Sequence, residues 1–360
     1  MADTKDMAEI EVSAPVSSDT EEQTQIGEVL LEVENLKTYF YLVSGIAKAV
    51  DGVSFTLSRG ETLGVVGESG SGKSVMSKSL IRLLESNARI EDGSVLFEGR
   101  DVLKMDKKEL RSLRGREVGM VFQDPMTSLD PVFKVGKQMI ENLRVHRNMS
   151  KAEARETAIN ALREVGIPNP EARFESYPFE LSGGMCQRVI IAMALCCDAK
   201  MIICDEPTTA LDVTVQAQVL RLLKDLQREK GIGLIMITHN LGVVWDTCDK
   251  VMVMYAGKVV EAASVKTLYS NPLHPYTWGL LDSMPSLADE RKTELATIPG
   301  MPPDLRLTGT CCNFYNRCPY AKPICEQEVP ELIEIEPGHL VACHRQCAAE
   351  HLERVKGGAQ

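Results

Sequence analysis

The chain has 360 residues, of which 44% are hydrophobic and 25% charged, and its net charge is −11. Enough apolar side chains are present for a large core, which excludes a disordered, collagen-like or fibrous chain. The length suggests one large domain or two modest ones, since domains usually contain about 100–200 residues. No apolar run reaches the roughly 18–20 residues that a membrane-spanning helix needs, because the apolar stretch 189–197 ends at Asp198. We therefore expect a globular chain that does not itself cross a bilayer.

Residues 1–28 hold eight acidic side chains and one lysine, a net charge of −7. They lack aromatic residues and do not begin with the basic and apolar regions of a secretory signal. We therefore expect a disordered acidic tail that promotes solubility. Subtracting −7 from the total of −11 leaves −4 for the other residues, so the overall acidity does not indicate a nucleic-acid-binding surface.

From Leu30 onward, short apolar runs alternate with amphipathic stretches, which predicts an α/β protein around a mostly parallel sheet. Three runs are candidates for buried strands that end in polar residues, as expected for a site at the carboxyl edge of a sheet: 63–68, 201–206 and 234–239. Residues 124–181 lack strand signals and predict a helical insertion. A hairpin is predicted over 251–263, and a rise in proline near residue 270 marks a change of character.

A glycine-rich loop follows the first of these strands. Residues 67–74, Gly-Glu-Ser-Gly-Ser-Gly-Lys-Ser, fit the phosphate-binding pattern G-x-x-x-x-G-K-[ST]. Glycines let successive backbone N–H groups point at phosphate oxygens, at the positive end of the next helix. Lys73 would reach the β and γ phosphates, and the Ser74 hydroxyl would ligate Mg²⁺. The predicted nucleotide-binding residues here are Gly67, Ser69, Gly70, Ser71, Gly72, Lys73 and Ser74.

Two further motifs lie downstream of the loop. Asp205 and Glu206 end an apolar strand, where Asp205 could hold the Mg²⁺ shell and Glu206 could polarise a water against the γ phosphate. In residues 181–188, LSGGMCQR, a Ser-Gly-Gly turn leads into an apolar helix and offers N–H groups and a hydroxyl to an anion. Ser182, Gly183 and Gly184 therefore predict a second phosphate-binding surface in the same chain.

In their order and spacing, these motifs resemble those of ATP-binding-cassette (ABC) ATPases. The resemblance covers about residues 30–265 and rests on Gly67 to Ser74, Gln123, Leu181 to Met185, Asp205, Glu206, Ala210 to Asp212 and His239. It implies an ABC-type P-loop domain at 29–265, with a mixed sheet core and a helical subdomain at about 124–185. It also implies a head-to-tail dimer, in which each ATP lies between one subunit's phosphate loop and its partner's LSGG turn.

The resemblance also implies roles for individual residues. Phe40 would stack on adenine, and Gln123 would contact Mg²⁺ and the attacking water. Glu206 would act as general base or water orienter, while Lys73 and His239 would stabilise charge on the γ phosphate. Cys186 departs from the family, which usually has a polar or basic residue there. Because no essential residue is missing, we expect this site to hydrolyse ATP.

Three segments, 123–131, 271–281 and 298–305, resemble the oligopeptide and dipeptide importer branch of the family. In that branch two different ATPase subunits dock beneath two membrane permeases at the cytoplasmic face of the membrane, and an extracytoplasmic binding protein delivers the peptide. The resemblance thus implies ATP-driven import of peptides, with no nucleic-acid partner. The alternatives are an importer ATPase for a metal chelate or sugar, a regulatory subunit, and a soluble ABC ATPase of DNA repair or ribosomes.

The cysteines fall into two groups. Five are scattered among apolar neighbours and predict buried thiols: Cys186, Cys196, Cys197, Cys204 and Cys248. The other six lie in the last 50 residues, within a predicted extension at 266–360.

Four of these six are spaced C-x5-C-x6-C-x17-C: Cys312, Cys318, Cys325 and Cys343. A reducing compartment argues against stable disulfides, whereas four thiolates suit either Zn²⁺ or an iron–sulfur cluster, and unliganded thiols also remain open. Residues 312–325 and 342–344 resemble the carboxyl-terminal motif of peptide-importer ATPases, which is associated there with a [4Fe-4S] cluster. The resemblance therefore favours iron–sulfur over zinc.

Overall fold

The computed structural model describes residues 27–209, 211–284 and 297–347. The predicted acidic tail lies almost wholly outside this part of the chain, and Ala210 also lies outside it. Gly27 and Glu28 are described, and Glu28 accepts a backbone hydrogen bond from Arg59 (N···O 3.0 Å).

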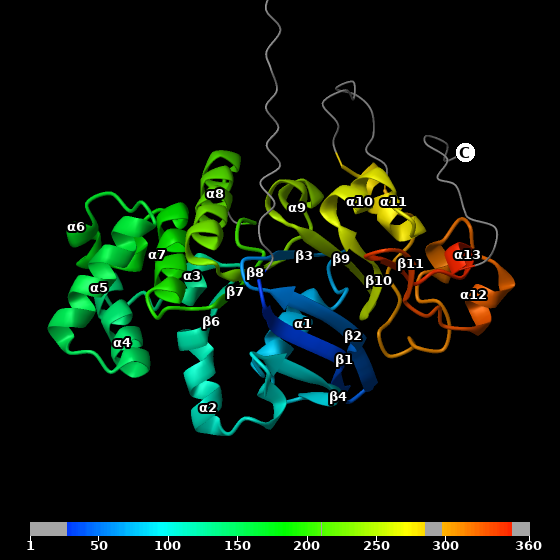
Figure 1. Ribbon diagram of the computed structural model, residues 1–360, viewed down its shortest axis with the longest axis horizontal. Helices are drawn as coiled ribbons and strands as arrows, with labels where there is room; N and C mark the ends of the chain where they lie inside the picture. Colours follow the sequence, from blue (N-terminus) through cyan, green and yellow to red (C-terminus); the bar gives the residue numbers. More distant parts are fainter. Residues whose placement is uncertain (1–26, 210, 285–296, 348–360) are drawn as a thin grey trace, which may run out of the picture.

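The central sheet has eight strands in the order β11-β12-β10-β9-β3-β8-β7-β6 (Figure 1). Five of them run parallel: β3 (Thr62–Val66), β6 (Val118–Val121), β7 (Met201–Asp205), β8 (Gly233–Ile237) and β9 (Lys250–Tyr255). The three runs predicted as buried strands are β3, β7 and β8, and every residue of these strands is buried. Their carboxyl ends meet at one edge, as expected for a ligand site.

The rest of this sheet is antiparallel, so the sheet is mixed rather than mostly parallel. The predicted hairpin is formed by β9 and β10 (Lys258–Ser264). The edge is then extended by β12 (His339–Val341) and β11 (Ile333–Glu336), which come from the C-terminal part of the chain. Sequence analysis did not predict these two short strands.

A second, wholly antiparallel sheet covers one face of the first, with strands in the order β2-β1-β4-β5. Its strands are β1 (Val29–Leu42), β2 (Gly45–Ser58), β4 (Ala88–Phe97) and β5 (Arg100–Asp101). Helix α1 (Lys73–Leu80) follows β3 and shares a core with both sheets, in which Leu30 and Val95 pack with Ile203 and Met76. Three short helices, η1 (Val102–Lys104), α2 (Lys107–Ser112) and η2 (Leu113–Glu117), lead into β6.

A group of helices forms the predicted insertion, at the left of Figure 1. Its helices are α3 (Pro125–Ser128), α4 (Val135–Arg147), α5 (Lys151–Glu164), α6 (Pro170–Phe174), η3 (Pro178–Glu180) and α7 (Gly183–Leu195). Buried side chains such as Met139, Leu162 and Val189 pack between these helices, in a core that continues onto β7, β8 and α8. A capping box between Ser150 and Glu153 begins α5.

The remaining helices lie on the other face of the central sheet and toward its antiparallel edge (Figure 1). They are α8 (Val213–Lys230), α9 (Leu241–Thr247), α10 (Val265–Ser270), α11 (Pro275–Asp282), η4 (Tyr315–Arg317), α12 (Pro323–Gln327) and α13 (His344–Cys347). Tyr276, Phe314 and Cys312 share one buried cluster with Val253 of β9. The C-terminal segment, residues 297–347, is therefore packed onto the sheet through both backbone pairing and a common core.

None of the described helices combines the length and the apolar character that crossing a membrane would require.

Candidate functional site

The predicted phosphate loop connects β3 to α1. Gly72 has a φ of 102°, and a Cβ placed there would lie 2.1 Å from the carbonyl oxygen of Ala49. Only glycine fits such a position without displacing the backbone of β2. Ser69 and Gly70, by contrast, are exposed. The turn therefore packs tightly on one side and leaves its other side open to a ligand.

Lys73 points back into the turn. Its Nζ donates to the carbonyl oxygens of Gly67 and Glu68, both at 2.8 Å, and lies 3.3 Å from the Oγ of Ser71. Burial lowers the pKa of Lys73, and the negative charges of Glu206, Asp205 and Glu68 oppose that shift. These carboxylates favour the charged ammonium, which is the form that binds phosphate.

Two oxygen ligands suited to Mg²⁺ meet beside the loop. The Ser74 hydroxyl donates to Oδ1 of Asp205 across 2.8 Å, which joins α1 to the end of β7. Burial raises the pKa of Asp205, while the Ser74 hydrogen bond and the charges of Lys78 and Lys73 lower it. A hydroxyl and a carboxylate at this spacing are hard ligands of the kind that Mg²⁺ prefers.

Glu206 lies at the centre of a second cluster. Its carboxylate accepts from Nε2 of Gln123 and from Oγ1 of Thr209, both at 3.0 Å, and its Oε1 lies 3.4 Å from Nδ1 of His239. Gln123 follows β6 and His239 follows β8, so the parallel strands bring these side chains together. Three of these four residues were predicted from the sequence; Thr209 was not, because it belongs to no motif.

The backbone of Glu206 is also unusual. Its φ of 49° is left-handed, which costs energy for a residue other than glycine. Its N–H donates to the carbonyl oxygen of Ile237, the last residue of β8, at 2.9 Å. That bond holds the strained residue against the neighbouring strand, with its carboxylate at the sheet edge.

The LSGG turn begins α7. Ser182 is exposed and caps this helix by accepting from the N–H of Met185 at 3.3 Å. A Cβ at Gly184 would lie 2.5 Å from Cγ1 of Val215 in α8, so glycine permits close packing of these two helices. Figure 1 places α7 in the helical group, apart from α1 and the phosphate loop. The two predicted phosphate-binding surfaces are thus separate within one chain.

Cys186, the departure noted within this motif, is fully buried, and its thiol donates to the carbonyl oxygen of Pro178 at 3.5 Å. Burial also raises its pKa. The side chain therefore fills the helical core instead of facing a nucleotide.

Phe40 lies on β1, opposite Ala47 of β2 and Ala88 of β4, and is half-buried. Stacking on adenine remains a prediction for this residue.

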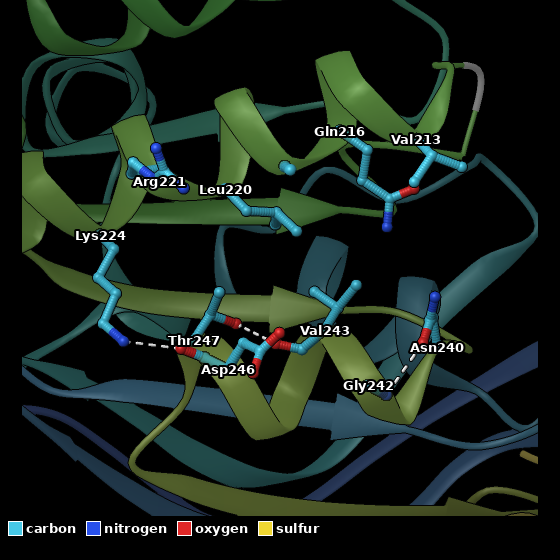
Figure 2. Close-up of a pocket in the computed structure, with 11 residues that line it drawn as sticks. Val213, Gln216, Leu220, Arg221, Lys224, Asn240, Gly242, Val243, Asp246 and Thr247 are labelled. Atoms are coloured by element: carbon cyan, nitrogen blue, oxygen red, sulfur yellow. Dashed lines mark hydrogen bonds between the residues drawn. The ribbon is translucent and has the colours of Figure 1, made fainter. Parts of the chain in front are cut away.

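A hollow of about 480 Å³ lies between α8 and α9, away from the phosphate loop (Figure 2). The Nζ of Lys224 reaches across it to the carbonyl oxygen of Asp246 (2.7 Å), and Asn240 caps α9. The hollow is lined by none of the predicted nucleotide ligands.

The scattered cysteines pack as predicted, although Cys248 is only partly buried; burial raises the pKa of Cys204 and of Cys248 to about 12 in each case.

In the C-terminal segment, Cys312 N donates to the Cys325 carbonyl oxygen at 2.9 Å. Burial, together with the nearby thiols of Cys325, Cys343 and Cys318, raises the pKa of Cys312 to about 12. The four predicted ligands are therefore neighbours. Within the described ranges, however, no three His, Cys, Asp or Glu side chains are grouped to hold a single metal ion.

Two family models match parts of this chain. A family model described as ABC transporter matches residues 50–209, and one described as oligopeptide/dipeptide transporter, C-terminal region, matches residues 260–325. The oligopeptide transport ATP-binding protein OppD of Salmonella typhimurium is 50% identical over 321 residues, which cover 89% of this chain and 95% of that protein. The dipeptide transport ATP-binding protein DppD of Lactococcus lactis is 48% identical over 313 residues, covering 87% and 89%.

Solved structures show the same fold. A dimeric ATP-binding cassette, MJ0796, bound to ADP and phosphate, has a TM-score of 0.59 and 27% identity, covering 66% of this chain and 99% of that one. CbiO1 of Clostridium perfringens, part of an ABC transporter complex, has a TM-score of 0.58 and 31% identity, covering 68% and 92%.

The fold and the phosphate loop define an ATP-binding-cassette ATPase. The chain belongs to the ABC transporter family, in the branch of the oligopeptide and dipeptide transport ATP-binding proteins.

Proposed function

We propose that the chain is the ATP-hydrolysing subunit of an importer that moves dipeptides or oligopeptides across the cytoplasmic membrane. The observation that supports this most strongly is that likeness to oligopeptide transport ATP-binding proteins extends over 89% of the chain. It includes the C-terminal region, where the oligopeptide/dipeptide transporter model matches residues 260–325. In this proposal the subunit lies peripherally at the cytoplasmic face of the membrane and has no nucleic-acid partner.

At the phosphate loop, backbone N–H groups and Lys73 hold the β and γ phosphates. Ser74 and Asp205 fit Mg²⁺ by their donor chemistry and their 2.8 Å contact, with Gln123 completing the set. The ion supplies charge neutralisation on the phosphates. Glu206 would orient the attacking water or accept its proton, and its contacts with Gln123 and His239 hold these two side chains beside its carboxylate.

The separation of the LSGG turn from the phosphate loop supports a head-to-tail dimer. In that arrangement Ser182, Gly183 and Gly184 bind the ATP held by the phosphate loop of a second ATPase subunit, and α7 directs its positive end at the phosphates. Peptide-importer ATPases come in two kinds, so we propose a heterodimer. The relative bound to ADP and phosphate is described as dimeric, which agrees with this arrangement.

Two permease subunits would dock on the helical insertion, and an extracytoplasmic peptide-binding protein would act through them. A hollow of about 790 Å³ lies between α4, α5 and α6 and has Phe174 and Val145 among its apolar lining. Lys134, Lys137 and Arg144 border it. A permease helix with apolar and acidic side chains would fit such a surface.

The four-cysteine group fits a [4Fe-4S] cluster by its donors. Cys312, Cys325 and Cys343 are buried, and the thiols lie near enough to alter one another's pKa. Four thiolates suit either a [4Fe-4S] cluster or Zn²⁺, and the resemblance of residues 312–325 and 342–344 to the carboxyl-terminal motif of peptide-importer ATPases favours iron–sulfur. When bound, the cluster would cross-link and stabilise the C-terminal segment, and Zn²⁺ is the alternative bound metal.

Membrane association tests the transport proposal. We expect the full-length chain to fractionate with membranes when permeases of its transporter are co-expressed and to leave them when the permeases are omitted. A chain that stays soluble beside its permeases and binds nucleic acid would contradict the proposal and favour a soluble ABC ATPase.

A further inference from the structure

Glu68, the second residue of the phosphate loop, forms an ion pair with Arg317, 249 positions later in the C-terminal segment. Nη1 of Arg317 lies 2.6 Å from Oε2 of Glu68, and Nη2 lies 2.9 Å from Oε1. This is a two-pronged contact of the kind that fixes both direction and distance. The side chain of Arg317 is only 4% exposed, whereas that of Glu68 is 29% exposed.

The guanidinium of Arg317 is held rigidly on its other sides. Its Nε donates to the carbonyl oxygen of Pro299 (2.9 Å) and its Nη2 to that of Ile298 (3.1 Å). Its Nη1 is also 3.3 Å from the hydroxyl of Tyr255. Because these contacts already fix the orientation of the Arg317 guanidinium, little conformational entropy is lost when it binds the Glu68 carboxylate.

The same loop residue is anchored at two backbone atoms as well. The N–H of Glu68 donates to the hydroxyl of the fully buried Tyr276 at 2.8 Å, and its carbonyl oxygen accepts from Lys73 at 2.8 Å. Glu68 is thus tied through its carboxylate and N–H to the C-terminal segment and α11, and through its carbonyl to the lysine that binds phosphate.

The C-terminal segment also lies against the outer side of the loop. A small cavity of about 10 Å³ is lined by residues 68–71 of the loop and by Pro302, Pro303 and Leu305. The carbonyl oxygen of Leu305 accepts from the N–H of Lys48 on β2 at 3.0 Å, which fixes the segment to the second sheet. The loop is therefore bordered by the C-terminal segment along this side.

We propose that Arg317 and Glu68 are positioning residues for ATP: their ion pair lets the C-terminal segment hold the phosphate loop in its binding geometry and neutralises a carboxylate beside the phosphates. The proposal rests on the ATPase activity of the family and not on the identity of the transported solute. Neither residue needs to touch the reacting atoms. Losing Arg317 would loosen the loop and would leave the charge of Glu68 uncompensated near an anionic nucleotide.

The test measures ATP binding by the full-length chain and KM and kcat for its ATP hydrolysis. Arg317→Met is expected to raise the Kd and KM for ATP about tenfold. We expect kcat to change by less than about twofold, because Lys73 and Glu206 are unchanged in this variant. Arg317→Lys, which keeps the charge but loses the fork, is expected to fall between this variant and the wild type. Unchanged Kd and KM in both variants would overturn the proposal.

A double variant separates positioning from a merely structural role. In Arg317→Met with Glu68→Gln, the uncompensated charge is gone, so ATP affinity should recover part of the loss. If Arg317→Met weakened ATP binding only by distorting the backbone around its neighbour Cys318, removing the charge of Glu68 would not restore the affinity. A double variant that binds ATP as weakly as Arg317→Met would therefore contradict the proposal. If Arg317→Met does not fold, the same comparison uses Arg317→Lys with and without Glu68→Gln, with the same two outcomes.

Arg306→Met is the matched control. Arg306 lies in the same segment and pairs with Asp304, but it is exposed and the pair makes no described contact with the phosphate loop. The ATP affinity of Arg306→Met should equal that of the wild type. An equal loss of affinity in this control would show that any lost arginine in the segment weakens binding, which would also overturn the proposal.

Discussion

At the scale of single residues, the most informative is Glu206. Its left-handed backbone and the three side chains around its carboxylate hold it at the edge of the sheet, where the γ phosphate of a bound ATP is expected. A residue with a strained backbone and a carboxylate that contacts several polar side chains at a sheet edge is typical of a functional site. Packing alone gives no reason to keep such backbone strain.

Replacing Glu206 with glutamine keeps the side-chain shape and removes the base. We expect Glu206→Gln to lower ATP turnover by about 10²–10³-fold while ATP binding is retained, because loss of a general base costs about this much. Steady-state hydrolysis and equilibrium nucleotide binding measure the two effects. Glu229→Gln, at an exposed position of α8, is the matched control and should be unaffected. Unchanged turnover of Glu206→Gln would remove its assigned role.

Motifs made the residues of the phosphate loop predictable, because a phosphate-binding turn has a fixed spacing of glycines and lysine. Gln123 and His239 could be predicted only through the family resemblance, since each is an isolated residue after a strand, whereas Glu206 was predicted from its place beside Asp205 at the end of an apolar strand. Thr209 and the Arg317–Glu68 pair were not predicted. Thr209 belongs to no motif, and nothing local in residues 67–74 indicates a partner 249 positions away.

At the scale of elements, the C-terminal segment joins the cassette instead of standing beside it. Strand β12 pairs with β10, and His339 of β12 lies 2.8 Å from Glu261 of β10, with both side chains fully buried. The carboxylate of Glu261 also accepts from the N–H groups of Leu273 and His274. A buried carboxylate with several donors fixes the register of the elements that it joins.

These strands escaped prediction for a physical reason. The sequence of β11, Ile-Glu-Ile-Glu, is short and half charged, and β12 has three residues. Pairing of so few residues becomes stable only through the rest of the sheet, which a local pattern does not show. Strands β3, β7 and β8 and the helical insertion were predictable, because short continuous apolar runs that end in polar residues indicate buried strands and residues 124–181 lack such runs.

The cysteine group allows a spectroscopic prediction at this scale. Anaerobically purified protein should show broad visible absorption and contain about four irons and four sulfides per chain. Cys325→Ser should lose this signal, because it removes a ligand, whereas Cys196→Ala, at the end of α7, should keep it. Zinc without iron or sulfide would refute the iron–sulfur assignment and support a Zn²⁺ staple.

At the scale of the whole molecule, the overall charge says little about function. The chain has a net charge of −11, of which −7 belongs to residues 1–28, so the cassette and C-terminal segment are close to neutral. Its two predicted phosphate-binding surfaces are separate, so each would form half of an ATP site in the proposed head-to-tail dimer. The C-terminal segment borders the phosphate loop of the same chain.

Peptide import is the central claim, and peptide-stimulated ATP hydrolysis tests it most directly. The measurement uses the complete transporter in lipid vesicles, with its binding protein and pools of dipeptides and oligopeptides, and takes the Glu206→Gln complex as background. We expect peptide to increase the rate of ATP hydrolysis and this increase to be absent in the Glu206→Gln complex. Hydrolysis that no peptide pool stimulates, but that a metal chelate or sugar does, would contradict it.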